Sequence, residues 1–272
     1  MNTEVVINID TENKVPEKRV WSFWATVGFG AAVIITFVII QVLVVIFYGV
    51  AIGFAQLQQT SGTTQFDDVF SKVWDILNAN LGLVQSIATI ASGIICTGLI
   101  LWFIKARKRA GIKEYLGLNK ISWKTVLLGL GVVIALIILT DVITYFLMGK
   151  STSEGIVSDI YDTSIWPPLF WIAVVIFAPL FEEAFFRGFL FEGFRQSRLG
   201  AAGAIFLTAL GWALLHSLQY QIFSIVWIFV LGIAMGIVRL KTKSIWSTFM
   251  MHAFVNIVAT AEVALKLSIF IR

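Results

Sequence analysis

Charged residues are scarce in this sequence. They make up 13% of the 272 residues, whereas hydrophobic residues make up 58%, and the mean hydropathy is +0.90. A soluble domain carries about twice that share of charge. A chain of this length could not bury so many apolar side chains in its own interior, so the composition excludes an ordinary soluble domain and indicates a protein surrounded by lipid.

Cysteine is almost absent, and no long basic tract is present. The single cysteine, Cys96, lies inside an apolar run, so no disulfide can form within the chain and we expect a packing residue. The net charge of +4 and the pI of about 9.2 come from short basic clusters beside apolar runs. Such clusters are typical of membrane-topology signals. No RNA-binding motif accompanies them, and we expect no nucleic-acid partner.

Long apolar runs are abundant. A bilayer core about 30 Å thick needs roughly 20 apolar residues per helix, and the sequence predicts an all-α, polytopic transmembrane helical bundle of about seven to eight spans. The first run is too long for the apolar part of a signal peptide, so we expect a retained span. Residues 1–19 are predicted to be a polar cytoplasmic tail and residues 20–272 a single membrane domain. The seven runs lie at about 22–56, 81–104, 125–148, 166–194, 201–218, 222–240 and 245–266.

Basic residues follow alternate spans. With seven spans, all the basic segments lie on one side, and the opposite loops are acidic. The positive-inside rule then predicts a multi-pass protein of the cell membrane with a cytoplasmic N-terminus and an extracytoplasmic C-terminus. If there is an eighth helix, we expect it to lie in the membrane interface at residues 111–123. The basic residues of these segments are Lys14, Lys18, Arg19, Lys105, Arg107, Lys108, Arg109, Lys113, Lys120, Lys124, Arg195, Arg198, Arg239, Lys241 and Lys243, whereas the opposite loops hold only Lys72 and Lys150 as basic residues.

A few ionisable side chains lie inside the predicted spans, where each costs roughly 2.5–3.5 kcal/mol. Glu183 and Arg187 are four residues apart, in the favourable acid-first order, and are predicted to pair. Glu182 points about 100° away from them, so it needs a partner on another helix and we expect it to face the chemistry. The ionisable residues singled out are Asp141, Glu182, Glu183, Arg187, His216 and His252, considered together with the neutral Asn256.

Three spans bring these groups to a similar depth. Glu183 and His216 each lie about 16 residues from the turn near Gly200, on the two arms of a predicted hairpin. Trp212 is expected on the face of His216, where it would line a pocket. His252 and Asn256, four residues apart, point the same way. His252 lies only about nine residues beyond a basic turn, which would place it nearer the membrane surface than Glu183. The two depths agree if the hairpin projects into the cytoplasm. We therefore expect this projection, with the cluster near the cytoplasmic face.

The cluster contains two carboxylates, two imidazoles and one carboxamide. A carboxylate can take a proton from water, and imidazole or amide donors can stabilise an oxyanion. Glu182, His216 and His252 also match the ligand type of a catalytic zinc site, so a divalent metal stays open. Taken singly, the Glu–Arg pair and each intramembrane His or Asn have structural interpretations. Asp141, with no motif beside it, is interpreted as structural or gating.

Three motifs carry a family resemblance. EEAFFR at 182–187, WALLH at 212–216 and HAFVN at 252–256 resemble the signature of the CPBP family, also called the Abi or CAAX prenyl endopeptidase family. The resemblance covers about residues 165–260, the expected catalytic core. It implies an intramembrane endopeptidase with a cavity open to the cytoplasm. Trp212 stands where the family often has phenylalanine, and we expect no loss of function from this difference.

The resemblance also implies a role for each site residue. Glu182 would activate water with the help of His216, while His252 and Asn256 would bind the oxyanion or position the scissile carbonyl. Glu183 and Arg187 would order the site. The family is usually called metalloproteases, yet a metal-free mechanism based on glutamate is also defended for it, and this sequence has no HExxH pair.

Other classes of protein are less well matched. The sequence lacks HExxH, the GxGD of aspartyl intramembrane proteases and the GxSG of rhomboid-like enzymes. Two alternatives without protease activity stay open. One is an immunity factor or scaffold that binds a peptide in the same cavity. The other is a proton-coupled transporter using Asp141, Glu182 and Glu183, which predicts two related halves that we do not find.

The expected partners follow from the membrane setting. They are membrane lipid and a membrane-tethered, hydrophobic or lipidated peptide. Prenylated CAAX proteins and bacteriocin precursors or leader peptides are equally open as substrates.

Overall fold

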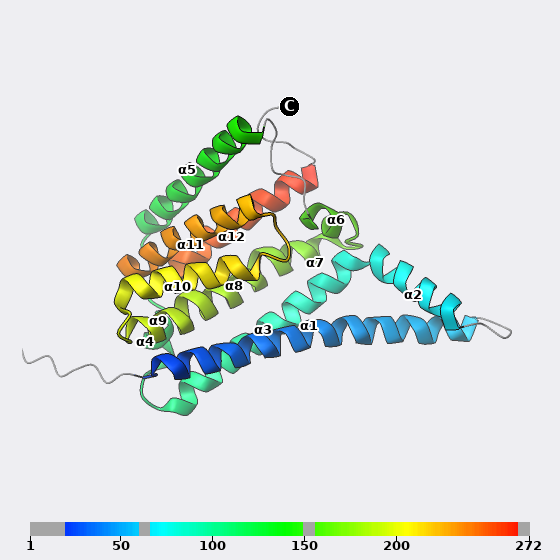
Figure 1. The fold of residues 1–272 in the computed structure, drawn as a ribbon, viewed down its shortest axis with the longest axis horizontal. Helices are drawn as coiled ribbons and strands as arrows, with labels where there is room; N and C mark the ends of the chain where they lie inside the picture. Colours follow the sequence, from blue (N-terminus) through cyan, green and yellow to red (C-terminus); the bar gives the residue numbers. More distant parts are fainter. Residues whose placement is uncertain (1–19, 60–65, 149–155, 266–272) are drawn as a thin grey trace, which may run out of the picture.

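The computed structural model describes residues 20–59, 66–148 and 156–265, and all the regular structure in these ranges is helical (Figure 1). The predicted all-α polytopic bundle is therefore confirmed. The helices are α1 (Phe23–Gln59), α2 (Phe66–Ala79), α3 (Leu81–Arg107), α4 (Ile112–Leu116), α5 (Trp123–Met148), α6 (Ile156–Asp162), α7 (Pro167–Ile172), η1 (Ala173–Phe177), α8 (Ala178–Glu182), η2 (Glu183–Leu190), α9 (Phe191–Arg195), α10 (Gly200–Leu215), α11 (Ile222–Thr242) and α12 (Ile245–Leu265).

The predicted seven runs correspond to six long helices and one short one. In the described ranges six helices are long and apolar enough to cross a membrane, and α10 is apolar but has only 16 residues. Sixteen residues rise about 24 Å, less than a usual span requires. Helices α10 and α11 pack along each other, and their connecting turn contains His216.

The fourth predicted run is a continuous helix from Pro167 to Arg195. Two stretches of it, η1 and η2, are π-helical. A π-helical turn is wider than an α-helical one and occurs frequently at functional sites. Both glutamates of the EEAFFR motif lie where α8 passes into η2.

The basic segments meet at one end of the bundle. The amide of Val20 donates to Oε1 of Gln196 over 2.9 Å, and Nε of Arg107 donates to the Val20 carbonyl over 3.0 Å. Nδ2 of Asn119 donates to the Lys243 carbonyl over 2.8 Å. The acidic helices α2 and α6 lie at the other end (Figure 1). The fold thus has the predicted alternation of charge, while the side that faces the cytoplasm stays a prediction, and the predicted tail at 1–19 lies outside the described residues.

Two segments differ from the sequence prediction. Residues 66–79, expected to be loop, form the amphipathic helix α2, which packs on the far half of the 37-residue helix α1. Gly49 and Gly53 lie in this contact, and a Cβ on either would meet a side chain of α2 at an ordinary van der Waals distance of 3.5 Å. Of the possible interfacial helix at 111–123, only α4 forms before α5 begins at Trp123, because Gly117 (φ 69°) ends α4 in the left-handed conformation.

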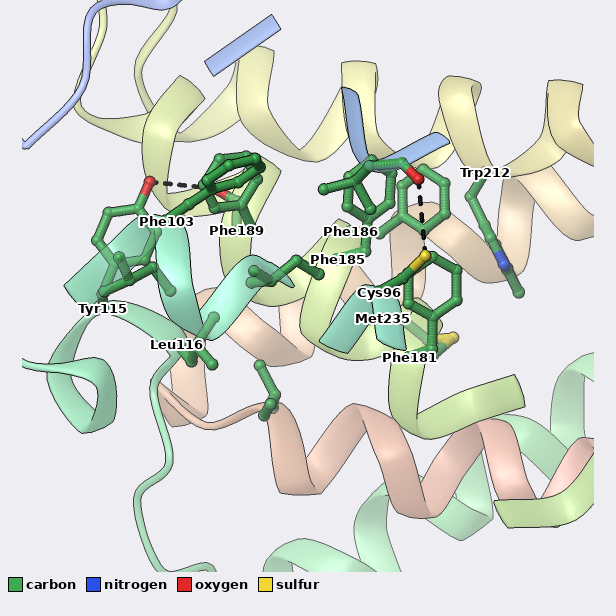
Figure 2. Close-up of a cluster of buried hydrophobic side chains, with 14 of the residues drawn as sticks. Cys96, Phe103, Tyr115, Leu116, Phe181, Phe185, Phe186, Phe189, Trp212 and Met235 are labelled. Carbon is green, nitrogen blue, oxygen red and sulfur yellow. Dashed lines mark hydrogen bonds between the residues drawn. The ribbon is translucent and has the colours of Figure 1, made fainter. Parts of the chain in front are cut away.

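Aromatic side chains anchor the Pro167–Arg195 helix to α1 and α3, and Figure 2 shows four of its phenylalanines in the buried cluster. Phe181 stacks on Phe37 of α1 at 5.2 Å between ring centroids, and on Phe185 at 5.8 Å. Cys96 of α3 is buried, with Sγ 3.7 Å from the Val33 carbonyl oxygen, as expected for a packing residue. Large buried rings supply much of the packing energy of such a core, and they fix the helix that carries the glutamates.

Gly82→Ala is predicted to destabilise the protein. A Cβ at Gly82 would overlap the carbonyl oxygen of Ile160 and lie 2.7 Å from the amide nitrogen of Ser164, and backbone atoms cannot move aside cheaply. We expect a loss of about 2 kcal/mol or more, measured as a lower midpoint of thermal unfolding in detergent. Gly98→Ala, on the same helix, is the control, because nothing lies within 4 Å of its Cβ position. Equal midpoints for the two variants would contradict the packing of α6 on α3.

Candidate active site

Glu183 is the centre of the polar cluster. Its side chain is only 1% exposed. Its Oε1 accepts two hydrogen bonds, one from a guanidinium and one from an imidazole. Nη1 of Arg187 donates over 3.1 Å and Nδ1 of His252 over 3.0 Å. The pairing with Arg187 predicted from the spacing is present. Helix α12 is bound to η2 through the same carboxylate oxygen.

Arg187 is buried completely and stacks on an aromatic ring. Its Cζ lies 4.3 Å from the centroid of Trp212 on α10, a cation–π contact that is strong where water is excluded. Nη2 also approaches Sδ of Met235 on α11 at 3.9 Å. Oε2 of Glu183 and Nε of Arg187 are buried without a hydrogen-bond partner among the described residues, so the site holds polar atoms that a water or substrate group can satisfy.

Glu182 is held differently from its neighbour. Its side chain is 19% exposed. Its Oε2 accepts a hydrogen bond from Nε1 of Trp212 and lies 3.9 Å from Nε2 of His252. The predicted partners on other helices are therefore present. Oε1 makes no hydrogen bond with any residue that the structure describes, so one carboxylate oxygen stays available.

Trp212 connects the two histidines. Its ring contacts His252 edge-on at 5.1 Å and His216 edge-on at 5.3 Å, measured between centroids. His216 directly follows α10, and its Nδ1 donates to the Trp212 carbonyl over 2.8 Å. A neutral His216 therefore has its lone pair on Nε2. The prediction that Trp212 shares the face of His216 is confirmed, but its indole N–H also binds Glu182, which phenylalanine cannot do.

Tyr220, in the turn after α10, also lies beside this group. Its ring centroid is 6.0 Å from that of His216. Burial, and then the charge of nearby Glu182, raises the pKa of the Tyr220 hydroxyl. The hydroxyl therefore keeps its proton at neutral pH and remains a donor. Sequence reasoning did not include Tyr220, although it lies four residues after His216.

Side chains from other elements bind the carbonyl oxygens of the two π-helical segments. Nδ2 of Asn256 donates to Val174 in η1 over 2.8 Å, and Nε of Arg239 donates to Arg187 in η2 over 2.9 Å. The Tyr115 hydroxyl donates to the Phe189 carbonyl in η2 over 3.2 Å (Figure 2). Burial, and then the charge of Glu192, raises the pKa of Tyr115 well above its usual value.

These bonds stabilise the wide turns from outside the helix. A π-helical turn changes the partners of the backbone carbonyls, and polar side chains can bind those that are left available. One amide hydrogen of Asn256 is consequently committed to Val174. The sequence prediction gave that side chain to substrate alone, and in this respect it was incomplete.

The predicted metal ligands do not form a metal site. Within the described ranges, no three His, Cys, Asp or Glu side chains are grouped so that they could hold a metal ion. Glu182 and His252 come within 3.9 Å, but Oε2 of Glu182 is already bound to Trp212. A three-ligand zinc site would need His216 in the same group. The set Glu182, His216 and His252 therefore does not fit a zinc ion in this geometry.

Asp141 is not part of the cluster. It lies on α5, close enough to Glu262 of α12 to interact with it electrostatically. Glu262 is ten residues beyond His252, about 15 Å along the helix. The relay of Asp141 with Glu182 and Glu183 that a transporter would need is thus not assembled.

The fold and this cluster define a class: a multi-pass helical membrane protein with a carboxylate–imidazole site inside its bundle. Residues 164–258 match the family model described as type II CAAX prenyl endopeptidase Rce1-like. The match confirms the resemblance to the CPBP family of membrane proteases, and it contains every site residue from Glu182 to Asn256. Comparisons with curated proteins and with solved structures found no match.

The Glu183–Arg187 pair is predicted to contribute more to stability than an ordinary surface pair. Arg187→Gln should cost about 3–5 kcal/mol, because it leaves a buried carboxylate without its cation. In the double variant Glu183→Gln/Arg187→Gln the loss should be smaller than the sum of the single losses by about 1–3 kcal/mol. Unfolding in mixed detergent measures all three variants.

Arg198→Gln supplies the control for this cycle, because Arg198 is exposed at the turn after α9. It should change stability by less than about 0.5 kcal/mol. Strict additivity of the two single variants would contradict the pair.

Proposed function

We propose that this protein is an intramembrane endopeptidase that hydrolyses a peptide bond by means of water activated by Glu182. The observation that carries the proposal is the unequal environment of the two adjacent glutamates. Glu183 is enclosed and bound by Arg187 and His252, whereas Glu182 is partly exposed and has a free oxygen. The family match over residues 164–258 supports the same class of reaction.

Glu182 is suited to the role of general base. A water bound to its free Oε1 can transfer a proton to the carboxylate while its oxygen attacks the scissile carbonyl carbon. The indole of Trp212 fixes the other oxygen of the same carboxylate. When the tetrahedral intermediate breaks its C–N bond, the proton on Glu182 passes to the leaving amine, and the carboxylate is regenerated.

His252 is suited to stabilising the oxyanion. Its Nδ1–H donates to Glu183, which fixes the orientation of the ring, as a carboxylate does for other catalytic histidines. Nε2 then faces the space beside Glu182, where the oxyanion would form, and a proton on Nε2 would make it a donor to that oxygen. The second amide hydrogen of Asn256 and the neighbouring His216 are further donors for the same oxygen.

The substrate class follows from the surroundings of the site. Apolar helices enclose it, and the short helix α10 ends beside it at His216. A peptide held at the membrane by a lipid or a hydrophobic segment would reach such a site, with the reacting carbonyl near the predicted cytoplasmic face. Both the class of substrate and the cytoplasmic position of the site are part of the proposal.

Glu182→Gln should abolish cleavage and leave folding intact. The amide has nearly the same shape but cannot accept the proton of the attacking water, so we expect a loss of about a thousandfold or more in kcat. The assay uses purified protein in lipid with matched lipidated and unlipidated membrane peptides, each with and without a chelator. Glu114→Gln, at an exposed position of α4, is the control and should keep full activity.

Full activity of Glu182→Gln would remove Glu182 as the base. A wild-type protein that binds the peptides with no cleavage would instead favour the scaffold or immunity alternative. Loss of activity in chelator would require a metal that the observed geometry does not hold.

Trp212→Phe should lower kcat/KM by about tenfold or more, because a hydrogen bond to a charged group contributes about 1.5–3 kcal/mol. The ring contacts with Arg187 and both histidines are largely kept by phenylalanine, so the thermal midpoint should change little. Peptide kinetics and thermal unfolding of the same preparation test the two expectations together. Unchanged kinetics would mean that the indole N–H does not position Glu182 for the reaction.

A further inference from the structure

A second polar feature lies away from the candidate active site, at the basic end of the bundle. It is a hollow of about 380 Å³ between the segment leading into α5 and the end of α11. We call it the lysine hollow. Three lysines and three hydroxyl side chains line it with two apolar ones, namely Lys120, Lys124, Lys241, Ser122, Thr125, Thr242, Ile121 and Leu128.

Hydrogen bonds hold the walls of the lysine hollow in place. Nδ2 of Asn119 donates to the Lys243 carbonyl over 2.8 Å, and Oγ of Ser244 donates to the Asn119 carbonyl over 2.6 Å. These bonds join the segment that carries Lys120 to the end of α11 that carries Lys241. The segments that carry the three lysines are therefore joined to each other and are not independent loops.

The charge of the lysine hollow is unbalanced. No acidic side chain lines it, and none of its lysines forms an ion pair with any residue in the described ranges. The Ser122 and Thr125 hydroxyl oxygens are 2.9 Å apart. Only one of the two protons is used in that contact, so the other can donate to an anion. Three cations and a free hydroxyl donor match a phosphate group.

The surroundings of the lysine hollow are apolar and unpartnered. Leu128, in its wall, is 72% exposed, and Trp123, at the first turn of α5, is 70% exposed. Helix α5 is long and apolar enough to cross the membrane. An exposed tryptophan at the end of such a helix is typical of the membrane–water interface. The hollow is therefore at the level where lipid headgroups lie.

We propose that the lysine hollow binds the phosphate of an anionic phospholipid, whose acyl chains lie along α5 beside Leu128. The lysines recognise the charge of the headgroup, the hydroxyls donate hydrogen bonds to its phosphate oxygens, and the apolar surface of α5 contacts the chains. Basic pockets between transmembrane helices are a known type of lipid-headgroup site. This inference does not depend on the proposed protease activity.

The test compares binding of phosphatidylglycerol and phosphatidylcholine to purified protein in neutral detergent, by native mass spectrometry and by fluorescence of a labelled lipid. The pocket variant is Lys120→Gln/Lys124→Gln/Lys241→Gln. The matched control is Lys105→Gln/Lys108→Gln/Lys113→Gln, which removes the same charge from the same end of the bundle but outside the hollow.

Wild type should prefer phosphatidylglycerol, and the pocket variant should lose affinity for it by about tenfold or more, since each lysine near an anionic lipid contributes about fivefold. The control should lose less than about threefold. Excess inorganic phosphate should not displace the lipid, because it lacks the acyl chains.

Three results would overturn the proposal. Equal losses in the two triple variants would mean diffuse attraction to the basic end, and no loss in either would mean no site. Displacement by inorganic phosphate alone would assign the hollow to a free anion. If the pocket variant does not fold, Lys124→Gln alone gives the same test, with an expected loss of about fivefold.

Discussion

The arrangement of the whole site depends on one buried carboxylate. Glu183 could not remain ionised in an apolar bundle without compensation, because an isolated buried charge is too costly. Arg187 on its own helix and His252 on α12 supply that compensation at a single oxygen. The same need determines what surrounds it: Arg187 stacks on Trp212, and Trp212 in turn binds Glu182.

This dependence explains how two neighbouring residues of the same type differ. The Glu183 carboxylate connects η2 with α12 through His252, so it is not available to act as a base. Glu182, one position earlier, points to a partly open space and meets only the Trp212 indole and, further off, His252. The enclosed Glu183 and its partners therefore hold the partly exposed Glu182 in position. Of the two glutamates, only Glu183 is fully buried and needs a compensating cation.

Local spacing was sufficient to predict several of these features. The four-residue interval between Glu183 and Arg187 predicted their pairing, because positions four apart share a helix face. The number of residues between each motif and its nearest turn predicted that EEAFFR, WALLH and HAFVN lie at a similar depth. The contact of His252 with Glu183 agrees with that prediction. Alternating loop charge predicted that basic segments such as those of Arg107 and Lys243 share one end of the bundle. The projection of the hairpin into the cytoplasm stays a prediction.

Features that depend on contacts between distant segments were not accessible in this way. No local sequence pattern predicts that Asn256 binds the Val174 carbonyl or that Arg239 binds the carbonyl of Arg187. Helix α2 was missed because its amphipathic pattern, with Asp67 and Asp68 in its first turn, resembles a polar loop when only long apolar runs are sought. The spacing of Glu182, His216 and His252, which are not grouped as three metal ligands in the described ranges, depends on the same long-range packing around Trp212.

The π-helical segments make the length of the fourth helix as important as its composition. Because a π-helical turn holds more residues than an α-helical one, removing one residue from Glu183–Leu190 would restore ordinary α-helical winding with little rotation of the flanking parts. The side chains within the stretch would then face different neighbours, although the parts before and after it kept theirs. The carbonyl contacts from Arg239 and Tyr115 would be lost together with the π-helical winding. This stretch therefore tolerates exchange of side chains better than any change in the number of residues.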